Sequence, residues 1–304
     1  MADPRVSGSV RRALALTIVL PLLLLAACGG GDAGPEKDEP VAEATARLFD
    51  FDRDAAFDSS EGQTAKQKDI VIKGMSYASP GGDRVSGIVV VPKRRIEGRA
   101  GVIFMHGAGG SRIDFIDEAA ILAARGAAVL AIDSPFSRSQ KPEVRAGQAL
   151  PPVTRELMIR NVKDLVRGFD LLVQKYGVSP ERLGIVGYSM GVQPAAAAAS
   201  LDARVKAVVL MAGRAYPSGT PGDAEWEVLF GPIDTVHFVP HLAPAKVLLQ
   251  GGKGDVVIPR EEMEQLYAAT SEPKEIRWYD AGHELGERSK DERLAWLGRE
   301  LGLK

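Results

Sequence analysis

Residues 183–191 read LGIVGYSMG, and an Ala-rich stretch follows them directly. The first four residues form an apolar run typical of a strand, and the Ala-rich stretch is typical of a helix. Between the two, Ser189 has a glycine two positions away on each side, which is the spacing of a nucleophile elbow. An ordinary strand-to-helix turn with a surface serine has the same spacing, but the flanking patterns favour the elbow.

The two glycines that flank the serine have a steric explanation. In so sharp a turn, side chains at Gly187 and Gly191 would collide with neighbouring backbone. The turn lifts the Ser189 hydroxyl above a sheet, and the helix N-terminus behind it favours negative charge that develops there. Pro194 is compatible with this helix because it lies near the first turn, where little is lost without an amide donor.

Other apolar runs rich in β-branched residues alternate with helical patterns along the chain. Strands are predicted at 69–73, 85–91, 102–105, 127–132, 183–186, 205–211, 247–250 and 275–279. Long crossovers separate the runs from Val102 onward, and runs that are apolar on both faces are typical of parallel strands covered by helices. The first two runs are close together and predict an antiparallel pair. The expected fold class is therefore α/β, with a mostly parallel central sheet.

The strongest helical pattern lies between Thr154 and Tyr176. Apolar residues recur there at spacings of four and three, at Met158, Val162, Leu165, Phe169, Leu172 and Tyr176. Such a stripe predicts a helix face packed on the core. Gly177 is expected to end the helix in the left-handed conformation. Further helices are predicted at 115–124, 189–200, 260–269 and 290–301.

Histidine is the natural partner for the serine, because a hydroxyl is a weak nucleophile at neutral pH unless a base accepts its proton. The chain has four histidines. His106 belongs to a Gly-rich segment, and His237 and His241 precede the strand predicted at 247–250. His283 follows the last predicted strand, where enzymes with this elbow carry their base. We therefore predict that His283 is the base.

A carboxylate must hold the imidazole in the correct tautomer and offset the charge that it gains. Asp255 follows the strand predicted at 247–250, between the serine and the histidine in chain order. Asp280 is the rival because it is nearer to His283 in sequence. However, side chains three residues apart at a strand end seldom face one another, so the sequence favours Asp255.

Residues 106–110, HGAGG, close the first predicted parallel strand and precede a helix. Acyl transfer builds negative charge on a carbonyl oxygen, and the amides of Ala108 and Met190 are expected to form the oxyanion hole that stabilises it. A plain Gly-rich turn is the alternative.

A dinucleotide-binding turn is a further alternative for this segment, because Gly107 and Gly109 follow a strand and Asp133 ends the next one. Arg112 replaces the third glycine of that fingerprint, and the Ser189 elbow would remain unexplained.

Composition excludes several classes of protein. The chain has 304 residues, 45% of them hydrophobic, with 33 Gly, 19 Pro and one Cys, which excludes disordered, collagen-like and disulfide-framework proteins. Lys plus Arg number 38 and Asp plus Glu number 40, so no basic field indicates nucleic-acid binding. Scattered histidines and a single cysteine favour no metal site.

The N-terminus has the charge order of a signal peptide. Three arginines precede an apolar run at 13–27, which is shorter than the roughly 20 residues of a spanning helix and is interrupted by Pro21. The run ends in Leu25-Ala26-Ala27-Cys28, which resembles the lipobox of bacterial lipoproteins, where the cysteine is acylated. We therefore expect an extracytoplasmic protein anchored to the cell envelope by lipid at Cys28. A signal peptide at 1–27, a flexible tether at 28–45 and one domain at 46–304 are expected.

The order of motifs from residues 106–110 through Asp133-Ser134-Pro135-Phe136, the elbow and Asp255 to His283 resembles an α/β hydrolase over about residues 70–303. Within that superfamily the chain is similar to dienelactone-hydrolase-like and prolyl-oligopeptidase-like serine esterases. Dienelactone hydrolase proper has a cysteine nucleophile, where this chain has Ser189. This departure argues against lactone specificity.

The resemblance implies a two-step hydrolysis of a small-molecule ester without cofactor or metal. Ser189 would attack the acyl carbonyl, His283 would transfer the proton, and Asp255 would orient His283. Two alternatives remain open: a non-catalytic envelope lipoprotein that binds through the hydrolase fold, and a serine peptidase of prolyl-oligopeptidase type. No propeller-sized domain precedes residue 70, which speaks against the peptidase.

Two stretches after strand ends, at 134–152 and 214–244, are expected to form a rim over the pocket. The second carries Tyr216, Trp226, Phe230, His237 and Phe238. These side chains either line an acyl or alcohol pocket or pack the stretch onto the body of the domain. Neither stretch is large enough for a full lid domain, which favours small or accessible esters over long triglycerides.

Overall fold

A computed structural model describes residues 41–138, 150–215 and 224–304. The predicted signal peptide, the lipidation site Cys28 and most of the predicted tether lie outside these ranges. Val41 is buried in the core, and the first helix, α1 (Glu43–Ala46), begins three residues before the expected start of the domain at residue 46. None of the described helices is long and apolar enough to cross a membrane.

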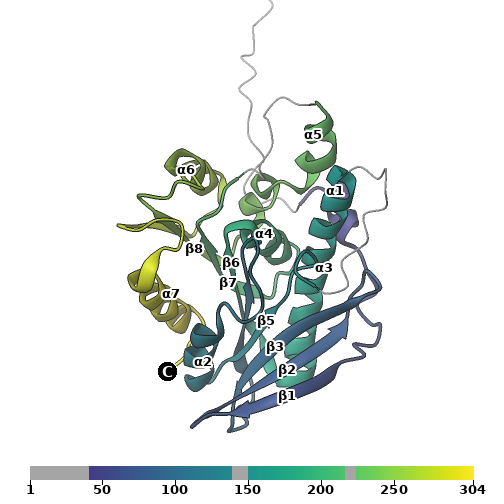
Figure 1. The fold of residues 1–304 in the computed structure, drawn as a ribbon, viewed down its shortest axis with the longest axis vertical. Helices are drawn as coiled ribbons and strands as arrows, with labels where there is room; N and C mark the ends of the chain where they lie inside the picture. The colour runs from purple at the N-terminus through teal and green to yellow at the C-terminus, as the bar shows by residue number, and fades with distance from the viewer. Residues whose placement is uncertain (1–40, 139–149, 216–223) are drawn as a thin grey trace, which may run out of the picture. The chain divides into compact units, whose positions relative to one another are not determined.

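The described residues form a nine-stranded sheet in the order β1-β2-β3-β5-β4-β6-β7-β8-β9 (Figure 1). β1, β2 and β3 pair antiparallel, β3 is antiparallel to β5, and all pairs from β5 to β9 are parallel. The strands are β1 (Ser60–Lys66), β2 (Ile70–Ala78), β3 (Arg84–Pro92), β4 (Arg99–Met105), β5 (Ala128–Ile132), β6 (Val178–Tyr188), β7 (Val205–Met211), β8 (Lys246–Gly252) and β9 (Lys274–Tyr279).

Helices cover both faces of this sheet. The α-helices after α1 are α2 (Ile116–Ala124), α3 (Leu150–Tyr176), α4 (Val192–Ser200), α5 (Ala224–Phe230), α6 (Arg260–Ala269) and α7 (Gly286–Glu300). Five 3-10 helices span Arg47–Phe49, Ser189–Gly191, Gly231–Ile233, Thr235–His237 and Val239–His241. Figure 1 shows α2 and α7 on one side of the parallel strands and α3 on the other.

The core has two layers, one on each face of the sheet, and successive side chains of each parallel strand point alternately into one layer and the other. In β4, Ile103 belongs to the same buried cluster as side chains of α3, α4 and α6, whereas Phe104 belongs to the cluster that includes side chains of α2 and α7. Phe104 lies opposite Ala131 of β5 and Val186 of β6, so three strands contribute to the same layer. Burying a large apolar side chain contributes about 1.5–3 kcal/mol to folding. Burial on both faces explains why these strands are apolar throughout.

The expected fold class, including the short antiparallel strands at its start, is confirmed. Each of the eight predicted strands has a counterpart. The five predicted helices correspond to α2, α3, α6, α7 and the 3-10 helix Ser189–Gly191 together with α4. Gly177 follows α3 with a φ of +66°, as predicted for a helix end. β1 was not predicted, because its sequence SEGQTAK is exposed along its whole length and carries no apolar pattern; it is an edge strand paired with β2.

Candidate active site

Polar side chains gather where the parallel strands end. Ser189 follows β6, Asp255 follows β8 and His283 follows β9. Because these strands run parallel in one sheet, their carboxyl ends lie at the same edge, which is where open α/β sheets bind ligands. The fold thus brings together three residues that are widely separated in the chain.

The turn at Ser189 is as sharp as its glycines predicted. Ser189 has a φ of +52°, in the left-handed region that side chains rarely adopt. A Cβ added to Gly187 would lie 2.6 Å from the carbonyl oxygen of Gly191, and one added to Gly191 would lie 2.5 Å from the carbonyl oxygen of Met105. Only glycine fits at either position, so the steric explanation of the motif is confirmed.

One imidazole bridges the serine and the acid. His283 Nε2 lies 2.9 Å from Ser189 Oγ, and His283 Nδ1 lies 2.8 Å from Asp255 Oδ2. The other oxygen of Asp255 accepts hydrogen bonds from the amides of Val257, at 2.8 Å, and Ile258, at 2.9 Å. The Asp255 side chain is only 2% exposed. It is therefore held in one position and faces the imidazole.

The rival acid points elsewhere. The side chain of Asp280 is 87% exposed, and its Oδ1 accepts a hydrogen bond from Lys253 Nζ at 2.7 Å. That ion pair lowers the pKa of Asp280, first through the hydrogen bond and then through the lysine charge. The structure therefore brings Asp255, and not Asp280, to His283.

Backbone hydrogen bonds join the loop that carries Asp255 to the loop that carries His283. The amide of Lys253 donates to the carbonyl oxygen of Tyr279 at 2.8 Å, and the amide of Gly254 donates to that of Ala281 at 3.0 Å. A Cβ on Gly252 would lie 2.3 Å from the carbonyl oxygen of Gly282. The close approach of these loops thus depends on the missing side chain of Gly252.

Tyr188 supports the histidine from the elbow side. Its ring centroid lies 5.3 Å from that of the His283 imidazole, and its hydroxyl donates to the His283 carbonyl oxygen at 3.4 Å. Burial, and then the charge of Glu284, raise the pKa of Tyr188, so its hydroxyl stays protonated at neutral pH and remains a donor.

His106 has a structural part in the Gly-rich loop. Its Nε2 accepts a hydrogen bond from the amide of Ser134 at 3.0 Å, so the ring proton is on Nδ1, which donates to the carbonyl oxygen of Gly107 at 2.7 Å. The histidine is 1% exposed and ties the loop after β4 to the loop after β5. Gly107 lies against the elbow, because a Cβ added to Gly107 would lie 3.0 Å from Ser189 Cβ.

The residue that argued against a dinucleotide site, Arg112, has an ion-pair partner. Its backbone amide donates to Asp133 Oδ1 at 2.8 Å, and its guanidinium forms a salt bridge with Asp133 Oδ2. Ser86 Oγ donates to the same carboxylate oxygen at 2.7 Å. Asp133 therefore anchors the Gly-rich loop to the sheet.

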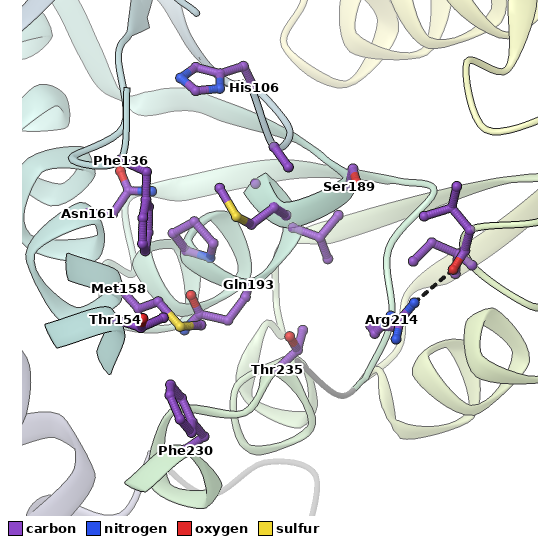
Figure 2. Close-up of a pocket in the computed structure, with 17 residues that line it drawn as sticks. His106, Phe136, Thr154, Met158, Asn161, Ser189, Gln193, Arg214, Phe230 and Thr235 are labelled. Atoms are coloured by element: carbon purple, nitrogen blue, oxygen red, sulfur yellow. Dashed lines mark hydrogen bonds between the residues drawn. The ribbon is translucent and has the colours of Figure 1, made fainter. Parts of the chain in front are cut away.

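A cavity of about 500 Å³ opens beside the serine (Figure 2). Ser189, Ala108 and Met190 all line it, so both predicted oxyanion-hole residues border the nucleophile. Much of its wall is apolar and consists of Phe136, Met158, Val192, Pro194, Phe230, Val257 and Ile258. An ester carbonyl next to Ser189 would thus have an apolar space for one of its two substituents.

The aromatic residues of the two rim stretches serve different purposes. Phe136 and Phe230 line the cavity. Phe238 instead packs in the core, with its ring centroid 5.7 Å from that of Phe49. Tyr216 and the side chain of Trp226 lie outside what the structure describes. Some aromatic residues of these stretches therefore line the pocket, and others pack the stretch onto the body of the domain.

Several polar residues that line the cavity were not predicted as site residues, and two of them carry side-chain amides. Asn161 of α3 and Gln193 of α4 line the wall, and they are only 3% and 6% exposed. Within the described structure, Asn161 Oδ1 and Gln193 Oε1 are buried and accept no hydrogen bond. An unsatisfied buried acceptor costs about 1–3 kcal/mol. The sequence signal was an amide side chain on an otherwise apolar face, since Asn161 lies next to Val162 and three residues after Met158.

The described residues contain no group of three or more His, Cys, Asp and Glu side chains that could hold a metal ion. What they contain is a hydroxyl hydrogen-bonded to an imidazole, a buried carboxylate on the far side of that imidazole, and an apolar cavity. This arrangement can activate the hydroxyl as a nucleophile toward a carbonyl carbon.

Comparisons with known proteins agree with this fold. The model of the dienelactone hydrolase family matches residues 85–295. An acetyl xylan esterase from Paenibacillus sp. R4 superposes with a TM-score of 0.70 at 21% identity, over 87% of this chain and 97% of that one.

Two further structures are similar. Acetyl xylan esterase 1 from Thermoanaerobacterium sp. JW/SL YS485 has a TM-score of 0.68 at 20% identity, over 85% of this chain and 94% of that one. A putative dienelactone hydrolase from Klebsiella pneumoniae has a TM-score of 0.58 at 21% identity, over 77% of this chain and 99% of that one. At such identities the likeness concerns the fold. A comparison with curated protein sequences found no significant match.

Proposed function

Because the chain belongs to the dienelactone hydrolase family, we propose that it is a serine hydrolase that cleaves carboxylic esters through an acyl-enzyme. The observation that carries this proposal is the line of hydrogen bonds from Ser189 through His283 to Asp255 at the edge of the cavity. In this line Ser189 is the nucleophile, His283 is the base, and Asp255 is the carboxylate that orients His283.

Acylation begins at Ser189. As Oγ attacks the ester carbonyl, its proton passes to His283 Nε2, which lies 2.9 Å away. The imidazole becomes positively charged, and the Asp255 carboxylate stabilises that charge and holds the Nδ1 proton. His283 then gives the proton to the oxygen of the leaving alcohol, and the acyl group stays on Ser189.

The tetrahedral intermediate carries a negative charge on the former carbonyl oxygen. The backbone amides of Ala108 and Met190 are the proposed donors to it, because both residues border the cavity beside Ser189. A preorganised donor of this kind contributes about 3–4 kcal/mol to transition-state stabilisation. Water activated by His283 then releases the acid and restores the serine, so the cycle needs no cofactor.

The test uses the soluble domain from about residue 40. We expect it to hydrolyse short p-nitrophenyl esters and to react covalently with a fluorophosphonate probe. Ser189→Ala should abolish labelling and reduce kcat by at least about 10³-fold, because the nucleophile is lost. Circular dichroism of the variant controls for folding.

The opposite outcome is also informative. Wild-type protein that neither turns over an ester nor reacts with the probe would overturn the proposal and favour the alternative of a non-catalytic envelope lipoprotein. Hydrolysis of peptide substrates in preference to esters would favour the peptidase alternative.

Short acyl esters are the proposed substrates. The two rim stretches are too short for a full lid domain, and two structural neighbours are described as acetyl xylan esterases. We expect kcat/KM to be highest for acyl chains of about two to six carbons. Preferential hydrolysis of long-chain esters in a chain-length series would contradict this.

For the N-terminal segment we propose lipid attachment at Cys28 after removal of residues 1–27 and an extracytoplasmic location on the cell envelope. The support is the order of charge, apolar run and Leu25-Ala26-Ala27-Cys28 in the sequence. Metabolic labelling with a fatty-acid analogue should mark the full-length protein and leave Cys28→Ser unmarked. Equal labelling of both proteins would exclude this attachment site.

A further inference from the structure

We infer that Arg214 is a positioning residue of the proposed active site, because it holds the peptide unit that in turn holds the Asp255 carboxylate. The inference rests on the proposed ester hydrolysis and adds a residue that the proposed catalytic cycle does not contain. Arg214 follows β7, which lies between β6, the strand before the elbow, and β8, the strand before Asp255. It lines the cavity, and Figure 2 shows its hydrogen bond as a dashed line.

One peptide unit connects Arg214 to the acid. Arg214 Nη2 donates to the carbonyl oxygen of Val257 at 2.8 Å, and the amide of Ile258 donates to Asp255 Oδ1 at 2.9 Å. That carbonyl and that amide belong to the same peptide unit, and in a trans peptide they point in opposite directions. The guanidinium therefore holds one side of a planar unit whose other side holds the Asp255 carboxylate.

The hydrogen bonds continue from this peptide unit to the nucleophile. A charged donor on the carbonyl polarises the peptide, which makes its N–H a stronger donor to the carboxylate. The second oxygen of Asp255 lies 2.8 Å from His283 Nδ1, and His283 Nε2 lies 2.9 Å from Ser189 Oγ. Arg214 can thus influence the nucleophile through the acid and the imidazole.

Glu262 holds the guanidinium through a second contact. Arg214 Nε lies 3.0 Å from Glu262 Oε2 in a partly buried salt bridge. That carboxylate oxygen is buried and accepts no hydrogen bond of normal geometry within the described structure, so the charge of the guanidinium compensates it. Glu262 lies in the first turn of α6, directly after the loop that carries Asp255. Arg214 therefore contacts both this loop and the helix that follows it.

The backbone that carries Arg214 is fixed as well. Ala212 has a φ of +46°, and its amide donates to the carbonyl oxygen of Gln250 in β8 at 2.8 Å. A Cβ added to Gly213 would lie 2.5 Å from Val192 Cγ2, so the chain runs directly against the first residue of α4. Left-handed backbone at a residue with a side chain persists only where the surrounding structure holds it. The position of Arg214 is thus set by β8 and by the helix behind the elbow.

Removing the guanidinium should lower the rate of the chemical step. The Val257 carbonyl would then bond to water, and the peptide unit could rotate and take the Ile258 amide away from Asp255. A small misplacement of a catalytic group costs up to about 10²-fold in rate. We expect Arg214→Met and Arg214→Gln to lower kcat for p-nitrophenyl acetate and for p-nitrophenyl butyrate by the same factor, about 10–100-fold.

Two further variants show whether the charged donor is responsible. Arg214→Lys keeps a charged donor on a long side chain, so its kcat should lie between those of Arg214→Met and wild type. Arg260→Met is the matched control. Arg260 begins the same helix that carries Glu262, and its Nε donates to Glu264 Oε1 at 2.8 Å. Its variant should keep kcat within about two-fold of wild type.

A double variant separates action through Asp255 from a direct contact with the substrate, since Arg214 also lines the cavity. In Asp255→Ala the peptide unit has no carboxylate to hold. Adding Arg214→Met to that variant should lower kcat by less than about two-fold further, because residues that act as a unit are not additive. If Arg214→Met costs the same factor in both backgrounds, or affects only one of the two esters, Arg214 acts on the substrate and the inference is overturned.

The outcomes also separate this inference from the proposed function. If wild-type protein hydrolyses no ester and reacts with no probe, the proposed function fails. If wild-type protein is active and the folded Arg214→Met variant keeps kcat within about two-fold, the proposed function stands and the inference fails. The inference also fails if Arg260→Met loses as much activity as Arg214→Met. Circular dichroism checks folding, and Arg214→Gln replaces the methionine variant if that variant does not fold.

Discussion

At the scale of single residues, the most consequential arrangement is the carboxylate behind the imidazole. The side chain of Asp255 is almost fully buried. One of its oxygens accepts hydrogen bonds from two backbone amides, and the other faces His283. Those amides fix the carboxylate before any substrate arrives. Asp280, three residues from His283 in sequence, points outward and pairs with Lys253. The two aspartates therefore make a matched pair for mutagenesis.

We predict that Asp255→Asn lowers kcat for a p-nitrophenyl ester by about 10³–10⁴-fold, because an amide in that position favours the wrong imidazole tautomer and offers no charge to the imidazolium. Asp280→Asn should leave kcat within about two-fold of wild type. Steady-state kinetics of both variants measures the difference. The assignment of the acid is refuted if Asp280→Asn is the more damaging change.

At the scale of elements, the site depends on two loops that follow neighbouring strands. The loop after β8 carries Asp255, the loop after β9 carries His283, and backbone hydrogen bonds join them at Lys253 and Gly254. The approach is so close at Gly252 that a Cβ would lie 2.3 Å from the carbonyl oxygen of Gly282. The distance between acid and base is thus set by backbone packing.

We predict that Gly252→Ala lowers kcat at least ten-fold and destabilises the fold by about 1–3 kcal/mol, because the loops must move apart to admit the methyl group. Gly254→Ala is the control, since an added Cβ there would lie 3.5 Å from the nearest atom, an ordinary contact. Kinetics and urea unfolding of the two variants give both quantities. Equal behaviour of the two alanine variants would disprove the steric explanation.

At the scale of the whole described domain, a buried ion pair joins two helices that cover the same face of the sheet. Arg293 of α7 and Glu118 of α2 form a salt bridge in which both side chains are less than 8% exposed. Arg293 Nη1 also donates to Ser289 Oγ at 3.1 Å. Removing one partner leaves a buried charge uncompensated, whereas removing both does not.

We predict that Arg293→Met destabilises the domain by about 3–5 kcal/mol, because Glu118 is left unpaired in an apolar layer. The double variant Glu118→Leu with Arg293→Met should recover more than half of that loss. Denaturant midpoints of the single and double variants measure the recovery. If the double variant is the less stable of the two, the ion pair stabilises through its own attraction rather than through charge compensation.

The sequence alone determined the alternation of strands and helices, because apolar periodicity reports burial locally. It also singled out Ser189 and His283 and favoured Asp255 over Asp280. It missed β1, whose exposed residues carry no apolar pattern, and it missed the cavity residues Asn161 and Gln193. The cavity residues depend on partners that are distant along the chain, whereas β1 depends on pairing with the strand that follows it.

Only the tertiary structure decided how the separated segments meet. The hydrogen bonds of His283 span 94 residues to Ser189 and 28 residues to Asp255, and no local pattern encodes a distance across parallel strands. The cavity likewise arises where α3, α4 and the loops after β4, β7 and β8 come together. Local residue chemistry specifies the elements and the candidate groups, while packing between elements sets the geometry in which those groups can react.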